Sequence, residues 1–241
     1  MKTYSVQLQA QEQLAEGTSA FHFTKPAGFE FIAGQALDLI LGEQGDADSE
    51  WDVRHTFSIV AAPHENELVI ATRMRDSRFK QRLKELPVGT QVQVEGPFGE
   101  LTLDADLTRA AVFIAGGIGI TPFMSMLRDA AQQQRQQDLL LLYSNRRPED
   151  SAFLSELQQL SQNNPRFKLI ATMTKMEGST QEWSGITGYL NAQRIQEYCQ
   201  ELSRPIYYIS GPPMLVEAMH DLLDEAGVDA DDVLSEGFLG Y

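Results

Sequence analysis

The sequence predicts two domains: an N-terminal antiparallel β-barrel over residues 1–104 and a C-terminal α/β domain with a parallel sheet over residues 105–241. Polar and apolar residues alternate along several short segments of the first hundred residues, which is the period of a β-strand. After about Asp106, apolar strands alternate with amphipathic helices, which favours a parallel sheet covered by helices on both faces. The length of 241 residues is sufficient for two ordinary domains.

Short alternating segments of the first half are the predicted barrel strands. Turn residues separate them, and several short strands at close spacing favour a barrel or a sandwich. In chain order they are TYSVQLQAQ, SAFHFTK, QALDLIL, HTFSIV, ELVIATRM and TQVQVEG. One helix interrupts the strands, because SRFKQRLKEL has helical spacing and Ser77 at its start is suited to be the N-cap.

The second half consists of strands and helices in turn, and its boundary with the first half lies within LTLDADLTRA, residues 101–110. The predicted strands are RAAVFIAG, DLLLLYSN, RFKLIATMT and PIYYISG. The predicted helices are TPFMSMLRDAAQQQ, EDSAFLSELQQL, NAQRIQEYCQEL and PPMLVEAMHDLLDEAG, and the short apolar segment DDVLSEGF follows them. Pro122 fits the first turn of its helix, where a proline costs no hydrogen bond.

The composition argues against nucleic-acid binding and against cysteine-based metal sites. The formal net charge is −15, with 34 Asp and Glu against 19 Lys and Arg, and so acidic a chain repels the phosphates of nucleic acids. The single cysteine, Cys199, forms neither an internal disulfide nor a cysteine-ligated iron–sulfur cluster, and we expect it to be a small buried helix residue. No metal site is predicted.

The expected location is the cytoplasm. The N-terminus lacks the apolar core of a signal peptide, and no apolar run approaches the roughly 20 residues that span a bilayer. We expect a monomer without nucleic-acid or membrane partners.

Two glycine-containing turns follow predicted strands. AGGIGITP, residues 115–122, follows one strand and opens a helix, so its glycines let the backbone approach an anion and the free N–H groups of the helix start attract phosphate. ISGPPMLVEAM, residues 209–219, repeats the arrangement, and ligands of open parallel sheets bind at the carboxyl ends of the strands. The alternative is that these glycines serve only close strand–helix packing.

The order of these motifs resembles the ferredoxin–NADP reductase superfamily, in which a flavin-binding antiparallel barrel precedes a nicotinamide-dinucleotide domain. The resemblance covers nearly the whole chain. Its motifs are RHTFS at 54–58, GPFG at 96–99, GGIGITP at 116–122, YSNRRPED at 143–150, GPPM at 211–214 and the terminal EGFLGY.

The resemblance implies a flavoprotein reductase. NAD(P)H would give a hydride from nicotinamide C4 to N5 of bound FAD, rather than FMN, and the flavin would pass electrons to a ferredoxin-like protein or another acceptor, including a small molecule. No fused iron–sulfur domain is expected. Two alternatives remain open: a reductase that uses flavin as a releasable substrate, and an electron-transfer subunit of a larger complex.

Three catalytic residues are implied by the resemblance. The Ser58 hydroxyl would lie near the reactive flavin ring. Ser210 occupies the position beside the nicotinamide where many members carry cysteine, and serine can still form a hydrogen bond there. Glu236 would serve proton transfer.

The first implied flavin element is the strand RHTFS, whose candidates are Arg54, His55, Thr56, Phe57 and Ser58. Aligning Phe57 and Ser58 with the family's aromatic–hydroxyl pair puts His55 at the position of the usual arginine. Alternation puts His55 and Phe57 on one face, so Arg54 would point away unless a bulge exchanges the faces. The alternative for His55 is an ordinary strand residue.

The second implied flavin element is MRDS, residues 74–77. It lacks the family's usual glycine, but Ser77 and the helix N-terminus remain. Because arginines crowd this region, we expect Arg73, Arg75 and Ser77 to hold the flavin phosphates. The alternative is that the arginines are simply solvated.

The dinucleotide would lie along the carboxyl edge of the parallel sheet. By resemblance, the first turn holds its pyrophosphate with Gly116, Gly117, Gly119, Thr121 and Pro122. The second turn contributes Gly211, Pro212 and Met214. A terminal aromatic, Phe238 or Tyr241, would cover the flavin face on which the nicotinamide stacks.

The choice of nicotinamide would depend on Arg146, Thr174 and Lys175. In NADP-dependent relatives the position of Thr174 and Lys175 contacts the 2′-phosphate, and a cationic cluster favours a phosphate over a hydroxyl. NADPH is therefore preferred and NADH stays open. The alternative is a solvated basic face.

Overall fold

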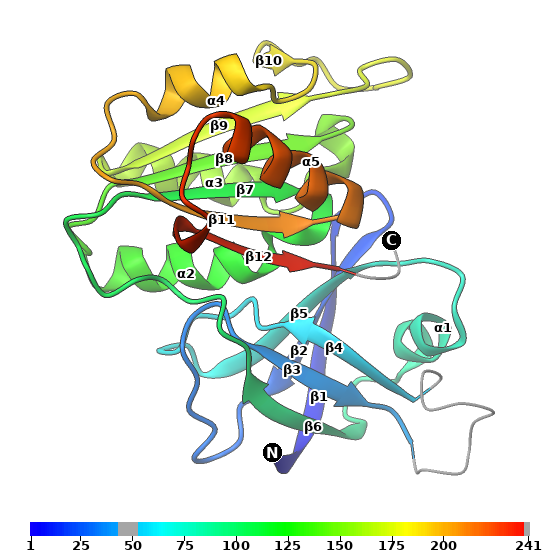
Figure 1. The fold of residues 1–241 in the computed structure, drawn as a ribbon. Helices are drawn as coiled ribbons and strands as arrows, with labels where there is room; N and C mark the ends of the chain where they lie inside the picture. The colour runs from blue at the N-terminus through cyan, green and yellow to red at the C-terminus, as the bar shows by residue number, and fades with distance from the viewer. Residues whose placement is uncertain (43–52, 239–241) are drawn as a thin grey trace. The chain divides into compact units, whose positions relative to one another are not determined.

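The computed structural model describes residues 1–42 and 53–238, which form two compact units (Figure 1). Within that part of the chain, the first unit comprises residues up to 102 together with 121–129. The second unit comprises 103–120 together with the residues from 130 onward. The predicted boundary between residues 104 and 105 remains our proposal for where two separately folding domains meet.

An antiparallel sheet forms the first unit, in the strand order β4-β3-β6-β1-β2-β5. The strands at the two ends of that order, β4 and β5, contact each other, so the sheet curls as a barrel does. The strands are β1 (Lys2–Ala15), β2 (Thr18–Thr24), β3 (Ala36–Ile40), β4 (Arg54–Ser58), β5 (Glu67–Arg73) and β6 (Gln91–Phe98).

The helix of this unit, α1 (Arg78–Glu85), follows β5. The Ser77 hydroxyl accepts a hydrogen bond from the backbone N–H of Lys80 at 3.3 Å. This is the geometry of a helix N-cap, so the prediction for the start of this helix is confirmed.

A parallel sheet forms the second unit, in the strand order β10-β9-β8-β7-β11-β12. Because β8 and β9 add on one side of β7 while β11 and β12 add on the other, the strand order reverses between β7 and β11. Open α/β sheets bind ligands outside the carboxyl ends of the strands at such a reversal. The strands are β7 (Ala111–Gly116), β8 (Leu139–Asn145), β9 (Phe167–Met173), β10 (Ile186–Thr187), β11 (Ile206–Gly211) and β12 (Val233–Gly237).

The helices confirm the predicted alternation with strands. The α-helices are α2 (Thr121–Gln132), α3 (Leu154–Asn163), α4 (Ala192–Cys199) and α5 (Pro213–Glu225). Short 3₁₀ helices are η2 (Gly117–Ile120), η3 (Pro148–Asp150) and η4 (Ala230–Asp232). The two-residue strand β10 was not predicted, because so short a segment shows no periodicity.

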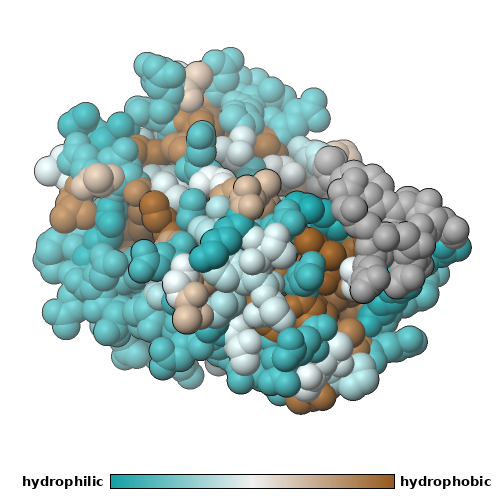
Figure 2. Space-filling view, turned by 90° about the horizontal axis from the view of Figure 1, so that it is seen from below, coloured by the Kyte–Doolittle hydropathy of each residue, from teal (hydrophilic) through white to brown (hydrophobic). Residues whose placement is uncertain are grey.

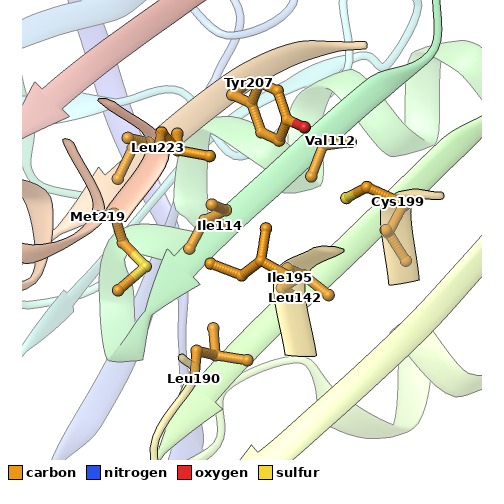
Figure 3. Packing of buried hydrophobic residues seen from close by; sticks show 11 residues of the cluster. Val112, Ile114, Leu142, Leu190, Ile195, Cys199, Tyr207, Met219 and Leu223 are labelled. Carbon is orange, nitrogen blue, oxygen red and sulfur yellow. The ribbon is translucent and has the colours of Figure 1, made fainter. Parts of the chain in front are cut away.

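Apolar side chains of α4 and α5 pack on one face of the parallel sheet (Figure 3). The cluster includes Val112 and Ile114 of β7, Leu140 and Leu142 of β8, Tyr207 and Ile209 of β11, Ile195 and Cys199 of α4, and Met219 and Leu223 of α5. Cys199 is buried at the end of its helix, as predicted, and burial raises the pKa of its thiol to about 11.

The opposite face of the sheet also carries helical structure. Tyr143, next to Leu142 in β8, points to that face, and its hydroxyl donates to the carbonyl of Ala152 just before α3 at 3.0 Å. Helices therefore cover both faces, which confirms the predicted α/β architecture.

Hydrophilic side chains cover most of the face drawn in Figure 2, in keeping with the acidic composition. The large hydrophobic residues that are exposed in the described part of the chain are Met1, Ile32, Val88, Leu107, Tyr189 and Met214. Within the same part, every helix is too short or too polar to cross a membrane.

Candidate functional site

Three glycines bring β7 and β11 together at the carboxyl edge of the parallel sheet. A Cβ on Gly119 would lie 2.3 Å from the carbonyl oxygen of Ser210 and 2.6 Å from the Cα of Gly211. A Cβ on Gly211 would lie 3.2 Å from the backbone of Gly116, and one on Gly116 would lie 2.8 Å from a methyl of Leu215. The alternative considered from the sequence, that these glycines allow close packing of a strand against a helix, therefore holds for all three.

Gly117 differs from its neighbours. Its φ of +55° is the left-handed region that favours glycine, and a Cβ there would meet no heavy atom within 4 Å. η2 and then α2 begin at this point, with Thr121 and Pro122 as the first two residues of α2. The backbone of Gly117 is thus the uncrowded part of the turn, where an anion can approach.

Ser210 and Glu236 share one row of the sheet. Ser210 of β11 pairs with Ala115 of β7 and with Glu236 of β12, so the three side chains point to the same face. Burial raises the pKa of Glu236 above its ordinary value of 4.5. The backbone N–H of Phe238 donates to the carbonyl of Gly211 at 3.1 Å, which places Phe238 beside the second glycine turn.

The other predicted residues of this edge lie at its rim. Pro212 directly precedes α5, and Met214 in the first turn of that helix is 82% exposed. Tyr241 lies outside the described residues, so its proposed place over the flavin stays a prediction.

Replacing Glu236 with glutamine tests the raised pKa. Ionisation of this half-buried acid costs the folded state free energy. The stabilisation from the protonated form is therefore complete below about pH 4.5 and is lost as the pH rises through the raised pKa. Glutamine mimics the protonated acid, so we expect Glu236→Gln to melt at a higher temperature than the wild type at about pH 8 and at the same temperature at about pH 4. The exposed Glu225→Gln is the control, and an equal effect at both pH values would contradict the assignment.

Three buried side-chain atoms of the described residues have no hydrogen-bond partner: Ser58 Oγ, Asn145 Nδ2 and Ser210 Oγ. Buried polar groups are almost always hydrogen-bonded, and each exception needs an explanation. Ser58 is on the predicted flavin strand, and the other two end strands at the predicted dinucleotide edge. Asn145, the last residue of β8, was not singled out from the sequence, because its burial is not visible there.

The ends of β8 and β9 hold two cations side by side. The backbone N–H of Lys175 donates to the carbonyl of Arg146 at 2.9 Å, and Thr174 donates to the carbonyl of Asn145 through its N–H at 2.8 Å and its hydroxyl at 3.1 Å. The side chains of Arg146 and Lys175 are exposed and form no ion pair with any described residue. These two predicted residues are therefore brought together and are available to a ligand.

The acidic residues that follow Arg146 in sequence are occupied elsewhere. Asp150 accepts hydrogen bonds from Arg147 at 3.0 and 3.1 Å. Glu149 accepts from the hydroxyl of Ser179 at 3.0 Å, from the N–H and hydroxyl of Thr180, and from the N–H of Gln181. Desolvation raises the pKa of Glu149, but hydrogen bonds from its own backbone N–H, from Thr180 and from Ser179 outweigh it and lower the pKa to about 2. Glu149 thus clamps the loop that carries Lys175.

Replacing Glu149 with alanine should release this loop. We expect trypsin to cleave after Lys175 several times faster in Glu149→Ala than in the wild type, because proteolysis follows local opening. Since the depressed pKa keeps Glu149 ionised until the pH falls towards 2, the wild-type clamp is present throughout the neutral range. Glu177→Ala, an exposed change in the same loop, is the control, and equal cleavage of both variants would contradict the clamp.

The two faces of β4 divide the predicted flavin residues of the first unit. The His55 ring lies 4.3 Å from the Phe79 ring of α1, and the Phe57 ring lies 5.9 Å from it, between ring centroids. His55 and Phe57 therefore share one face, as alternation predicts. Ser58 follows at the end of the strand and is buried.

Arg54 and Thr56 lie on the other face, with two carboxylates. The Arg54 guanidinium donates to Asp38 at 2.6 and 2.9 Å and to Glu95 at 2.6 Å, and the Thr56 hydroxyl donates to Asp38. The hydrogen bond to Asp38 raises the pKa of Arg54. Arg54 already has two acidic partners, so flavin binding by Arg54 and Thr56 stays a prediction.

Replacing Asp38 with alanine should destabilise the first unit by about 2 kcal/mol, because the change leaves Arg54 and Thr56 without their shared buried acceptor. The side chain of Asp38 is 10% exposed, against 24% for Glu95. We expect Glu95→Ala to cost about 1 kcal/mol or less in the same urea titration. A larger loss for Glu95→Ala than for Asp38→Ala would contradict this ranking.

The start of α1 gathers cations. Arg73 ends β5, Arg75 lies in the connection, and Ser77 caps the helix. Lys80 was missed by sequence reasoning. It is only 9% exposed, and its Nζ donates to the carbonyl of Arg73 at 2.8 Å. Nothing in the sequence signals its burial, because its neighbours Gln81 and Arg82 are polar as well.

Comparison with known proteins agrees with these two units. Residues 113–221 match the family model of the oxidoreductase NAD-binding domain. The chain is 27% identical over 231 residues to the glycine betaine monooxygenase reductase subunit of Chromohalobacter salexigens, covering 95% of this chain and 61% of that protein. It is 28% identical over 214 residues to ferredoxin–NADP reductase B of Sorangium cellulosum, covering 87% and 82%.

A solved structure shares the fold. The ferredoxin NADP⁺ reductase of Neisseria gonorrhoeae, solved with bound FAD and NADP, superposes with a TM-score of 0.83 at 19% identity, covering 98% of this chain and 99% of that one. The chain thus has the same arrangement of an antiparallel sheet followed by a parallel one.

Proposed function

We propose that the chain is a flavoprotein reductase of the ferredoxin–NADP reductase superfamily, which transfers a hydride from NADPH to a bound FAD and electrons onward to a separate acceptor. The observation that carries this proposal is the pair of buried, unpartnered hydroxyls of Ser58 and Ser210. One lies on the strand expected to contact the flavin, and the other lies at the reversal point of the parallel sheet.

The residues of the first unit fit a flavin. His55 and Phe57 present an aromatic face, Ser58 has a free hydroxyl, and the cationic start of α1 suits phosphate. Bound FAD would supply the redox chemistry, by accepting a hydride at N5 and releasing electrons one at a time. Ser58 would orient the ring through a hydrogen bond. Its hydroxyl is covered by protein atoms, so the contact requires a rotation of the side chain.

The residues of the second unit fit a dinucleotide. Gly117 would admit the pyrophosphate, and the Ser210 hydroxyl would hydrogen-bond the nicotinamide end and align it for transfer. Burial raises the pKa of Glu236, in the same row, so this acid would keep its proton to a higher pH than an exposed glutamate does. The exposed cations Arg146 and Lys175 support NADPH over NADH, since a phosphate ester accepts charge-assisted hydrogen bonds that a ribose hydroxyl cannot match.

The acceptor is proposed to be a separate redox protein. Two curated relatives are named as a monooxygenase reductase subunit and a ferredoxin–NADP reductase. With a net charge of −15, the chain favours a partner that presents basic residues at its docking surface. We further propose that the protein acts as a monomer in the cytoplasm.

A second candidate is a reductase that uses flavin as a substrate. The observation that favours it is that Arg54 is paired with Asp38 and Glu95, which leaves His55 as the candidate for a phosphate contact on the proposed flavin face of β4. Histidine is mostly neutral at pH 7, so this strand would attract a flavin phosphate less strongly.

Gel filtration after incubation with FAD separates the two candidates. We expect the filtered protein to keep a yellow flavin band near about 450 nm, and NADPH to bleach that band without oxygen more readily than NADH. A colourless filtered protein that still reduces added flavin would show that flavin is the substrate. Failure of both nucleotides to reduce bound or added flavin would contradict both candidates and favour a non-catalytic electron-transfer subunit.

A further inference from the structure

Glu149 joins two loops at the carboxyl edge of the parallel sheet. It lies in η3, after β8, and accepts hydrogen bonds from three consecutive residues of the loop after β9, the neighbouring strand (Figure 1). The Ser179 hydroxyl lies 3.0 Å from both carboxylate oxygens, while the N–H and hydroxyl of Thr180 and the N–H of Gln181 donate to Oε1. An ionised carboxylate has about four acceptor positions, so the loop occupies nearly all of them.

The loop between the two strands is short and is shaped by its own turn. Lys175 at its start is tied to Arg146 by the backbone hydrogen bond of 2.9 Å. The chain then reverses in a turn closed by the N–H of Ser179 and the carbonyl of Met176 at 3.0 Å, and Gly178 provides the left-handed φ of +78° that this turn contains. The residues before and after the turn are therefore both fastened to the segment that follows β8.

Glu149 acts on the loop and not on the two exposed cations beside it. Among these described residues, neither Arg146 nor Lys175 forms an ion pair with Glu149, whose oxygens are taken by the loop. The neighbouring Arg147 pairs with Asp150 instead. The carboxylate therefore holds the loop in place without competing with an anionic ligand for the exposed cations.

We propose that Glu149 is a positioning residue for nucleotide selection: by fastening the loop after β9, it keeps Lys175 beside Arg146, where both can meet the 2′-phosphate of NADPH. This inference rests on the proposed function, which supplies the nucleotide, and adds a residue that touches no ligand. A single backbone hydrogen bond at an exposed residue opens readily, so the second attachment is needed to keep the loop closed. A loop that is ordered beforehand costs less to order on binding, and NADH, which lacks the phosphate, gains nothing from it.

Calorimetric titration with NADP⁺ and NAD⁺, in the presence of saturating FAD, tests the inference without turnover. We expect Glu149→Ala to raise the Kd for NADP⁺ by about 10-fold, which corresponds to the cost of ordering one or two side chains on binding, and to leave the Kd for NAD⁺ unchanged. Glu149→Gln keeps an acceptor oxygen for the loop and should retain most of the affinity for NADP⁺. A merely structural role would weaken the binding of both nucleotides.

Glu177→Ala is the matched control, because Glu177 is an exposed acid of the same loop and has no hydrogen bond or ion pair with the described residues. Loss of a negative charge near two cations favours a phosphate by itself. Glu177→Ala should therefore leave the Kd for NADP⁺ unchanged or lower it, whereas Glu149→Ala should raise it, although each variant removes one carboxylate.

Two combined variants show whether Glu149 acts through the loop and the cations. Ser179→Ala/Thr180→Val removes the hydroxyl donors from the other side of the contact and should also raise the Kd for NADP⁺. In a protein that already carries Arg146→Ala and Lys175→Ala, Glu149→Ala should cause no further loss, because the groups through which it acts are gone.

An unchanged Kd for NADP⁺ in Glu149→Ala, an equal rise for both nucleotides, or a further loss in the protein without the two cations would overturn the inference while leaving the proposed function intact. A wild type that binds NADP⁺ and NAD⁺ equally would contradict the preference for NADPH, and the inference would fall with it. If the wild type binds neither nucleotide, it is the proposed function that fails.

Discussion

Gly119→Ala is expected to destabilise the second unit by about 3 kcal/mol or more and to abolish binding of either nicotinamide nucleotide. The new Cβ would lie 2.3 Å from the carbonyl oxygen of Ser210 and 2.6 Å from the Cα of Gly211. Both are backbone atoms of β11, so no side-chain rotation relieves the clash. The end of β11 must move, and it carries the hydroxyl of Ser210 with it.

Gly117→Ala is the matched control for this change, two residues earlier in the same turn. Nothing lies within 4 Å of its Cβ, so its cost is the left-handed backbone alone, about 1 to 2 kcal/mol. Urea unfolding of both variants measures the difference. If Gly119→Ala proved no less stable than Gly117→Ala, the close approach of η2 and β11 would not be the reason for a glycine at position 119.

The double variant Arg146→Ala/Lys175→Ala is expected to raise the KM for NADPH by about 100-fold while leaving the KM for NADH nearly unchanged. Each side chain would give up a charge-assisted hydrogen bond to the 2′-phosphate, and NADH has no such group. Both cations are exposed and form no ion pair with the described residues, so their removal should not destabilise the fold.

Lys168→Ala controls for the loss of positive charge, because Lys168 lies near the opposite end of β9. Steady-state kinetics measure the KM for NADPH and the KM for NADH in the wild type and in each variant. An equal rise in the KM for NADPH and NADH, or no rise for either, would contradict the assignment of Arg146 and Lys175 to the phosphate.

The secondary structure was predictable because it follows from local periodicity. The alternation in RHTFS correctly placed His55 and Phe57 on one face and Arg54 on the other. The partners of Arg54 were not predictable, because Asp38 and Glu95 lie on β3 and β6, 16 and 41 residues away, and strand pairing cannot be derived from one segment.

The separate roles of the glycines in the first turn could not be predicted from the sequence either. The sequence does not distinguish Gly116, Gly117 and Gly119, whereas in the structure only Gly117 combines a positive φ with open space for a Cβ. Lys80 was missed for a similar reason. Its polar side chain suggests an exposed position, whereas the way α1 packs in the first unit buries it.

The most direct test of hydride transfer to a bound flavin is a single-turnover reduction without oxygen, followed by stopped-flow absorbance at about 450 nm. The reconstituted protein is mixed with NADPH or with NADPH deuterated at nicotinamide C4. The proposed function predicts that the flavin band bleaches in one turnover, that deuterium slows this phase, and that Ser210→Ala slows it further without releasing the flavin. Bleaching at the same rate with both nucleotides would mean that hydride transfer does not limit the reduction, and no bleaching at all would contradict the reductase assignment.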